Sequence, residues 1–382
     1  MNLSPLLLIS VAFSAVYLVM VMYFLAGWLR AKKTTGNLQG DLPFVSIIIP
    51  TRNESENIQN CLRSIFAQNY PRDKYEVIVV DDYSTDATLR LAREMQQPNL
   101  LVLDLMQYLG RPGEYIPNKK KAIALGIKNA KGPIIITTDG DCTRGTNWLR
   151  TMVGAYLQGN YKLLTGPVMM KPARWPLEIF QQLDVINLVA ITGATITNGF
   201  PTMCNGANLL YPKEVFAEVE GFKGNMELPT GDDIFLMQKI AARYPEGIGF
   251  VKNMDACVFT RPEKTLSAFI SQRVRWISKS SRYGASAVAT VLYFAYLFHL
   301  LIVIDGLYAL SGLPAGWWPV AIAGGTKFTV DLLFNLPVVI FFRKPLLLLA
   351  YPIVNIFYVI YVVVIGVLSL TGKYRWKDRL IS

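Results

Sequence analysis

The chain has 382 residues, of which 52% are hydrophobic and 17% are charged. This balance is more apolar than that of an ordinary soluble domain and predicts membrane-spanning segments. The net charge of +11 suits nucleic acid, an anionic small substrate or the cytoplasmic face of a membrane. The sequence contains no recognisable nucleic-acid-binding module, so we expect no nucleic-acid partner. The four cysteines show no Cys-x-x-Cys spacing, which favours reduced thiols over a zinc site or a disulfide framework.

The first apolar stretch, Leu3 to Leu29, carries no charge and is long enough to cross about 30 Å of hydrocarbon as a helix. Arg30, Lys32 and Lys33 follow at once, and the positive-inside tendency places that end in the cytoplasm. A cleaved signal peptide is the alternative, but such peptides carry positive charge before a shorter apolar core. We therefore predict a retained anchor, followed by a polar linker.

Strand-like and helix-like patterns then alternate along the chain. The apolar β-branched runs are typical of strands buried on both faces of a parallel sheet. The predicted fold class is α/β, with a doubly wound, mostly parallel sheet whose polar clusters gather at one edge. The expected strands are Phe44–Ile49, Tyr75–Val80, Leu100–Leu105 and Ile134–Ile136, and the expected helices are Ser55–Gln68, Ala87–Met95 and Lys119–Ala130.

Two of these strands end in acidic residues. Asp139 and Asp141 flank a glycine after the fourth strand, and carboxylate oxygens suit a hard cation such as Mg²⁺ or Mn²⁺ that also holds phosphate. The second strand ends at Asp81, which is followed by Asp82. The alternative for Asp139 and Asp141 is a solvated turn closed by their own side chains. The sequence thus predicts a metal-diphosphate site.

Several motifs together resemble the family 2 glycosyltransferases with the GT-A fold, and in particular membrane-bound members such as cellulose, chitin and hyaluronan synthases and lipid glucosyltransferases. The motifs are Val45–Ser64, Val77–Thr88, Ile134–Cys142, Cys204–Asn208, Gly231–Asp233 and Gln272–Trp276, in the order that family shows, and the likeness covers roughly Phe44 to Lys279. This resemblance implies an inverting, metal-dependent transfer of sugar from a nucleotide-sugar donor, with a UDP-sugar favoured.

The resemblance also implies roles for single residues on the donor side. Thr51 and Glu54 would contact the nucleoside, and Asp81 would read the base. Lys119 would touch the donor, and Asp139 would bind the donor and share the metal with Asp141. Here Asn118 stands where the family usually has a glycine before the lysine. The residue patterns leave two alternatives open: Glu54 as a helix cap, and Lys119 as part of a solvated basic face.

On the acceptor side, the resemblance implies that Asp233 is the base that deprotonates the acceptor hydroxyl, supported by Asp232. Asn205 and Gly206 would line the acceptor and sugar side. Gln272, Arg275 and Trp276 resemble the family's Gln-x-x-Arg-Trp signature, which is associated with the diphosphate and with stacking on the acceptor. The alternatives are that Asp232 and Asp233 cap a helix over Ile234–Ala242, and that the basic aromatic stretch anchors the membrane interface.

Three further stretches are long enough to span a membrane, which gives four spans with the first one: Ser286–Leu310, Trp317–Phe342 and Leu346–Leu370. Four spans would leave the basic C-terminal tail outside, against the charge tendency. The alternative is that one C-terminal segment is re-entrant or lies in the interface, with the interrupted stretch around Lys327, Asp331 and Pro337 as the candidate. Lys327 and Asp331 are expected to pair or to face a polar cavity, either lining a lipid headgroup site or neutralising each other.

The sequence therefore predicts a multi-pass integral membrane enzyme with a cytoplasmic catalytic domain, a nucleotide-sugar donor and a lipid or glycan acceptor at the membrane. The alternatives are a processive polysaccharide synthase, a non-catalytic nucleotide-binding scaffold and, with least support, a transporter. The expected divisions are an anchor over 1–30, a linker over 31–43, a GT-A domain over 44–262, an interfacial segment over 263–285, a membrane region of about three segments over 286–371 and a basic tail over 372–382.

Overall fold

The computed structural model describes residues 4–35, 41–110, 118–172, 176–228, 231–277, 287–312, 316–370, 374–376 and 379–381. The chain forms two compact units. The sheet unit consists of Arg30–Pro172 and Leu188–Pro262, and the helical unit consists of Met1–Leu29, Ala173–Asn187 and Glu263–Ser382.

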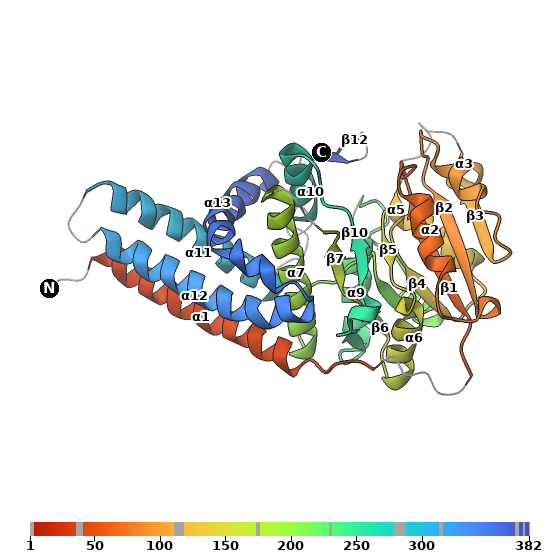
Figure 1. Ribbon diagram of the computed structural model, residues 1–382, viewed down its shortest axis with the longest axis horizontal. Helices are drawn as coiled ribbons and strands as arrows, with labels where there is room; N and C mark the ends of the chain where they lie inside the picture. Colours follow the sequence, from red (N-terminus) through yellow and green to blue (C-terminus); the bar gives the residue numbers. More distant parts are fainter. Residues whose placement is uncertain are drawn as a thin grey trace. The chain divides into compact units, whose positions relative to one another are not determined.

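A seven-stranded sheet of order β3-β2-β1-β4-β8-β6-β9 forms the centre of the sheet unit (Figure 1). The first four strands along the chain pair in parallel, whereas β8 runs antiparallel to both β4 and β6. The predicted α/β class with a mostly parallel sheet is thereby confirmed. The strands are β1 (Val45–Thr51), β2 (Tyr75–Asp81), β3 (Leu100–Asp104), β4 (Ile134–Thr137), β6 (Leu163–Thr165), β8 (Leu209–Pro212) and β9 (Ile248–Phe250).

The central strands are buried along their whole length, which explains their continuous apolar sequence. The buried polar side chains within them are paired, because an unpaired buried polar group is costly. Ser46 donates to Glu76 at 2.6 Å, and the same carboxylate oxygen accepts the backbone N–H of Lys131 at 2.6 Å. The strands are therefore tied together by side-chain bonds as well as by the backbone ladder.

Helices connect and cover these strands. α2 starts later than predicted because the backbone N–H groups of Asn57 and Ile58 both bond to the carbonyl of Glu54, which forms a turn before the helix. An unpredicted short helix, α4, follows β3 because Asp104 caps it by accepting the N–H of Met106. The helices of the sheet unit are α2 (Ile58–Phe66), α3 (Thr88–Arg93), α4 (Leu105–Leu109), α5 (Lys119–Asn129), α6 (Trp148–Gln158), α8 (Lys213–Glu218) and α9 (Asp232–Arg243).

A second, three-stranded sheet of order β5-β10-β7 belongs to the same unit. Its middle strand, β10 (Val258–Thr260), pairs antiparallel with β5 (Thr143–Arg144) and parallel with β7 (Val168–Met170). The short strand β5 directly follows the predicted metal-binding loop. The small sheet therefore joins that loop to a strand more than a hundred positions further along the chain.

Long apolar helices make up most of the helical unit, and Figure 1 shows α1, α11 and α12 running side by side. Polar bonds link them: Ser10 on α1 donates to Asp305 on α11 at 2.8 Å, and Tyr17 on α1 donates to Asp331 on α12 at 2.7 Å. The helices are α1 (Pro5–Arg30), α10 (Leu266–Ile277), α11 (Ala287–Leu310), α12 (Trp317–Phe341) and α13 (Tyr351–Leu370).

Among the residues that the structure describes, five helices are long and apolar enough to cross a membrane, whereas the sequence predicted four spans. The additional one, α7 (Pro176–Thr197), begins in the helical unit and ends in the sheet unit. Its hydropathy of 1.4 lies well below the 2.4 of α1, because Glu178, Asp184 and several amides interrupt its apolar residues. A helix of this composition is typical of a buried helix as well as of a span, and sequence periodicity alone does not separate the two.

One expectation about the last helices is confirmed and one needs correction. α12 continues without a break through Lys327, Asp331 and Pro337, in agreement with the predicted helix over Trp317–Phe342 and against the alternative of an interrupted segment there. The expected pairing of Lys327 with Asp331 is confirmed at 2.8 Å, one helical turn apart. The last span starts at Tyr351 instead of Leu346, because a 3₁₀ turn over Pro345–Leu349 precedes it.

The C-terminal tail forms a two-stranded ribbon of β11 (Tyr374–Trp376) and β12 (Arg379–Ile381), paired antiparallel. The remaining residues of the predicted tail lie outside the described residues. So do residues 278–285 of the predicted interfacial segment and residues 36–40 of the predicted linker.

Candidate active site

The site is built at the edge of the main sheet where the parallel strands end. Thr51 at the end of β1 lies opposite Asp81 at the end of β2, and Ile48 lies opposite Thr137 at the end of β4. Because β8 is antiparallel, its first residue, Leu209, also lies opposite Thr137. The sheet topology therefore brings the residues after β1, β2 and β4, and those before β8, to one edge.

The loops after β1 and β2 are bonded to each other. Asn53, which has a positive φ of 49°, donates its N–H to Ser84 Oγ at 3.0 Å and accepts the N–H of Thr85 at 2.8 Å. The N–H of Glu54 donates to Thr88 Oγ1 at 2.7 Å. Asparagine tolerates the left-handed conformation better than most residues. These bonds fix the backbone that carries two of the predicted nucleoside contacts.

The side chain of Asp81 is buried next to these loops, and the residue is 2% exposed. Its Oδ2 accepts the N–H of Ser84 at 2.9 Å, whereas its Oδ1 is buried and accepts no hydrogen bond from the described residues. Burial raises the pKa of this carboxyl above its ordinary value, and the bonds from Ser84 oppose the rise. A buried acceptor without a partner suits the ring N–H of a nucleobase.

Arg52, which the sequence analysis did not assign to the site, supports the same region. Its buried side chain donates to the carbonyl oxygens of Asp82 and Tyr83 at 2.7 and 2.8 Å. It thereby holds the chain directly after Asp81. The sequence shows an arginine beside the polar cluster, but the inward direction of the Arg52 side chain depends on the fold.

Gly140, between Asp139 and Asp141, packs against the predicted nucleoside contacts. A Cβ atom placed on Gly140 would lie 2.8 Å from Cγ2 of Thr51 and 3.4 Å from Cγ of Glu54. The first distance is shorter than van der Waals contact allows. Glycine is therefore required for the predicted metal-binding loop to approach the loop after β1.

Asp141 is oriented by a residue from the small sheet. Thr260 on β10 donates its hydroxyl to Oδ2 of Asp141 at 2.9 Å, and the thiol of Cys142 lies 3.2 Å from Oδ1. Burial, followed by the nearby Asp141 carboxylate, raises the pKa of Cys142, so this thiol stays protonated. The sequence analysis missed Thr260, because nothing local links it to a loop so far away.

Lys119 joins the predicted metal-binding loop to the predicted base motif. Its Nζ lies 2.7 Å from Oδ1 of Asp139 and 3.1 Å from Oδ2 of Asp232. Asn118 caps α5 by accepting the N–H of Lys120, so the asparagine found in place of the family's glycine sets the start of this helix. Lys120 is itself buried and donates to two backbone carbonyls. Neither Lys119 nor Lys120 therefore lies on a solvated face.

Asp233 contacts the segment that precedes β8. Its Oδ2 accepts the N–H of Gly206 at 3.2 Å, and its Oδ1 accepts the N–H of Ile234 at 2.8 Å. A Cβ on Gly206 would lie 2.9 Å from Asp232 Oδ2 and 3.3 Å from Lys119 Nζ. Gly206 thus lies in contact with Lys119, Asp232 and Asp233, while Asn205 closes the turn by accepting the N–H of Ala207 at 3.0 Å.

The donor set is compatible with a divalent cation. Within the described ranges, no three His, Cys, Asp or Glu side chains form a group that could hold a metal ion by themselves. Mg²⁺ and similar cations commonly use one or two carboxylates together with substrate phosphates. In the structure the ammonium of Lys119 occupies a cation position on Asp139. Asp139 and Asp141 therefore fit a cation whose remaining ligands would come from a diphosphate and water.

Gln272, Arg275 and Trp276 lie on α10 in the helical unit. Gln272 donates to Glu263 at 2.9 Å and accepts from Arg273 at 2.8 Å. Arg273, which the sequence analysis did not single out, is 2% exposed, lies 2.7 Å from Asp184 and stacks at 4.0 Å over the ring of Trp276. One face of this indole is thus covered by a guanidinium group.

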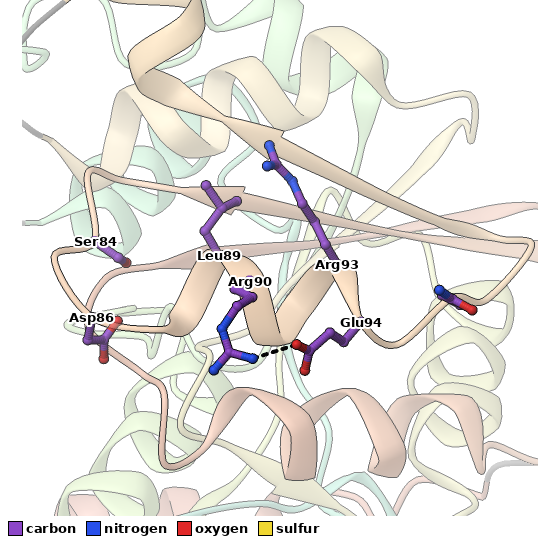
Figure 2. A pocket seen from close by; sticks show the side chains of 7 residues that line it. Ser84, Asp86, Leu89, Arg90, Arg93 and Glu94 are labelled. Carbon is purple, nitrogen blue, oxygen red and sulfur yellow. Dashed lines mark hydrogen bonds and ion pairs between the residues drawn. The ribbon is translucent and has the colours of Figure 1, made fainter.

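An open pocket of about 480 Å³ lies beside α3, and Figure 2 shows Arg90 reaching toward Glu94 in it. Ser84 and Asp86 border it at the loop after β2. None of the predicted site residues lines it. This pocket therefore adjoins the loop after β2, but the predicted site residues do not form it.

Comparison with known families identifies the class of this protein. The model of "Glycosyl transferase family 2" matches residues 46–218, and that of "Glycosyl transferase family group 2" matches residues 134–371, which is more than half of the chain. The chain therefore belongs to the family 2 group of glycosyltransferases and has the GT-A fold.

Individual relatives agree with this class. "Glycosyltransferase AglE" of Haloferax volcanii is 38% identical over 131 residues, 33% of this chain and 40% of the relative. Dolichyl N-acetyl-alpha-D-glucosaminyl phosphate 3-beta-D-2,3-diacetamido-2,3-dideoxy-beta-D-glucuronosyltransferase of Methanococcus voltae is 34% identical over 114 residues, 30% of this chain and 34% of the relative. These matches therefore span well under half the length of each relative.

A solved structure shares the fold over almost the whole chain. The mannosyltransferase PcManGT from Pyrobaculum calidifontis, solved in complex with GDP-Man and Mn²⁺, has a TM-score of 0.59 and 21% sequence identity. The similarity covers 96% of this chain and 99% of that structure. At this level of identity it supports the fold alone.

Proposed function

We propose that this protein is an integral membrane enzyme that transfers a sugar, with inversion, from a nucleotide-sugar to a lipid or lipid-linked acceptor, using Mg²⁺ or Mn²⁺ at Asp139 and Asp141. The observation that carries the proposal is the contact of Lys119 with both Asp139 and Asp232. This contact joins Asp139, which is suited to a cation and a diphosphate, to Asp232 beside the proposed base Asp233.

The chemistry follows from the positions of these side chains. The acceptor hydroxyl oxygen forms a bond to the anomeric carbon as the bond from that carbon to the diphosphate oxygen breaks, and Asp233 takes the hydroxyl proton. A positioned carboxylate base contributes about 10²- to 10⁴-fold. When bound, the divalent cation would neutralise charge on the departing nucleoside diphosphate. Lys119 supplies a further positive charge on the same side. Single attack from the opposite face inverts the anomeric centre.

Asp81 is proposed to read the base with its buried Oδ1, while Thr51 and Glu54 contact the nucleoside. We favour a UDP-sugar. The name of one relative describes a lipid-linked substrate, and one structure with the same fold contains GDP-Man and Mn²⁺. These findings support a membrane-held acceptor and a divalent cation, and they make a GDP-sugar the necessary second donor to test.

The membrane location is proposed from the apolar helices. The basic residues directly after α1, Arg30, Lys32 and Lys33, favour a cytoplasmic catalytic domain. Lys33→Cys and Gly312→Cys, each introduced alone into an otherwise cysteine-free variant, can be labelled with an impermeant maleimide. We expect Lys33→Cys to react only from the cytoplasmic side, and reaction from the opposite side would exclude this orientation.

The reaction itself is tested by incubating purified full-length protein with UDP- and GDP-sugars, Mn²⁺ or Mg²⁺ and extracted lipid. We expect metal-dependent release of nucleoside diphosphate together with a new glycolipid. Long polymers on a gel would indicate a processive synthase instead. Nucleotide binding without release or transfer would indicate a scaffold.

A further inference from the structure

We propose that Arg144 is a positioning residue that holds the Asp139–Cys142 loop in the shape needed for the divalent cation, and that Trp148 and Asn208 extend this support to the segment that contacts Asp233. The inference rests on the proposed function, because it concerns the metal and base of that same site. No motif indicated Arg144 or Trp148, and Asn208 was included only as the last residue of the Cys204–Asn208 motif, without a role of its own.

The guanidinium of Arg144 forms hydrogen bonds at both ends of the loop. Arg144 is 7% exposed and donates through Nη2 to the hydroxyl of Thr138 at 3.2 Å and to the carbonyl of Cys142 at 2.9 Å. Thr138 comes directly before Asp139, and Cys142 comes directly after Asp141. A single buried side chain therefore spans the predicted metal-binding loop.

Arg144 is itself held in place. It pairs with Val258 in the small sheet, which also brings Thr260 to the carboxylate of Asp141. Its guanidinium stacks at 4.8 Å over the ring of Trp148. The backbone of Arg144 is thus held in the small sheet, and its guanidinium lies over an indole ring.

Trp148 connects Arg144 to Asn208. The indole is fully buried, and its Nε1 donates to Oδ1 of Asn208 at 3.0 Å. The amide of Asn208 donates in turn to the carbonyls of Pro167 and Ala256 at 2.9 and 2.8 Å. Every polar atom of this amide group is therefore used within the protein.

Asn208 closes the turn that presents Gly206. Its backbone N–H bonds to the carbonyl of Asn205 at 3.0 Å, and within that turn Gly206 donates its N–H to Asp233. A continuous series of contacts thus runs from the metal-binding loop, through Arg144, Trp148 and Asn208, to the proposed base.

Charge alone predicts the opposite effect on the metal. A buried guanidinium near two carboxylates repels a divalent cation, so its removal would tighten metal binding if Arg144 acted only through its charge. If it acts by holding the loop, its removal weakens metal binding. Lysine keeps the charge but lacks the planar fork, so Arg144→Lys separates the two effects.

The test measures Mn²⁺ binding to full-length protein by the electron paramagnetic resonance signal of free Mn²⁺, with UDP and, separately, GDP present. We expect Arg144→Lys and Arg144→Met to raise the apparent dissociation constant about tenfold or more, as changes in residues that orient metal ligands do. Arg150→Lys, on the neighbouring helix α6, is the matched control. Unchanged or tighter binding in the Arg144 variants would overturn the inference while leaving the proposed function intact. Absence of Mn²⁺ binding by the unchanged protein with both nucleotides would remove both.

The path to Asp233 is tested with Trp148→Phe, which keeps an aromatic ring beneath Arg144 but loses the N–H that reaches Asn208. We expect kcat of sugar transfer to fall about tenfold, because the buried Oδ1 of Asn208 loses its hydrogen-bond donor next to the turn that contacts Asp233. The affinity for Mn²⁺ should stay near normal. Tyr156→Phe on the same helix is the control. An unchanged kcat would overturn the extension through Trp148.

Discussion

The ammonium nitrogen of Lys119 lies 2.7 Å from the carboxylate of Asp139, which belongs to the loop after β4. Burial lowers the pKa of Lys119, but the charges of Asp139 and Asp232 outweigh it and raise the pKa above its ordinary value of 10.5. A raised lysine pKa contributes stability that is fully present below 10.5 and is lost only as pH rises through the folded value. Lys119 therefore stays charged throughout the neutral range.

Replacing this lysine should remove a fixed positive charge from the site. We expect Lys119→Met to lower kcat/KM about 100-fold, in the range seen when one group that stabilises developing charge is deleted. Lys128→Met changes an exposed lysine on the same helix and should leave kcat/KM unchanged. Initial rates of nucleotide release measure both. Full activity in Lys119→Met would exclude a role for its charge.

Asp233→Asn tests the proposed base. The amide keeps an oxygen that can accept the N–H of Gly206, but it cannot take the acceptor proton. We expect donor binding, measured by calorimetry, to stay within about twofold, and transfer to fall by about 10²-fold or more. Asp255→Asn, an exposed aspartate in the same unit, is the control. A variant that still transfers sugar at the normal rate would assign the base to another group.

Gly140 provides a test of the contact between two loops. In Gly140→Ala the new methyl group would lie 2.8 Å from Cγ2 of Thr51, so the predicted metal-binding loop must shift. We expect weaker binding of the donor with Mn²⁺, by about tenfold, as for other changes that displace metal ligands. Gly145→Ala is closely matched, because a Cβ there meets nothing within 4 Å. Equal donor affinities in the two variants would show that the close contact is unimportant.

Acidification should weaken donor binding through Asp81. Burial raises the pKa of this carboxyl above 3.8, so on lowering the pH it becomes protonated earlier than an exposed aspartate and loses its capacity as a full acceptor. The same shift means that its contribution to folding stability falls as pH rises from 3.8 through the folded pKa. Acid therefore weakens the donor site without unfolding it through this group.

The measurement is donor affinity as the pH is lowered from neutrality, in the unchanged protein and in Asp81→Asn. We expect the affinity of the unchanged protein to decrease on acidification. The asparagine variant should bind more weakly at neutral pH and should lose this part of the pH dependence. The same pH dependence in both proteins would assign the titration to another group.

The buried ion pair of Arg273 and Asp184 predicts a stability effect in the helical unit. Both side chains are 2% exposed, with their charged atoms 2.7 Å apart. Removing one partner leaves an uncompensated buried charge, so Arg273→Met should lower the free energy of unfolding by about 3 to 5 kcal/mol. Thermal unfolding in detergent gives the comparison, with Lys264→Met, at an exposed position, as the control.

The double variant Arg273→Met with Asp184→Leu removes the stranded charge as well. We expect most of the lost stability to return, because apolar replacements of a buried ion pair are often neutral. If the double variant is as unstable as the single one, packing of Arg273 against Trp276 matters more than its charge.

The sequence by itself determined the parallel half of the sheet, because continuous β-branched runs such as those of β1 and β4 have few other places to be buried. It also determined which acidic residues follow those strands, and parallel strands present their ends at a common edge. Family membership follows from the same local motifs. The first apolar helix and the pairing of Lys327 with Asp331 were likewise readable, since both depend on residues close together in the chain.

Only the tertiary structure decided how distant residues complete the site. The antiparallel direction of β8 carries Gly206 to Lys119 and Asp233, and the pairing of β5 with β10 brings Thr260 to Asp141. Long-range pairing leaves no periodic signal in either partner, so Arg144, Trp148 and Thr260 read as ordinary residues in the sequence. The sequence did not separate a membrane span from a buried helix at α7 for a related reason: burial in protein and burial in lipid select the same apolar side chains.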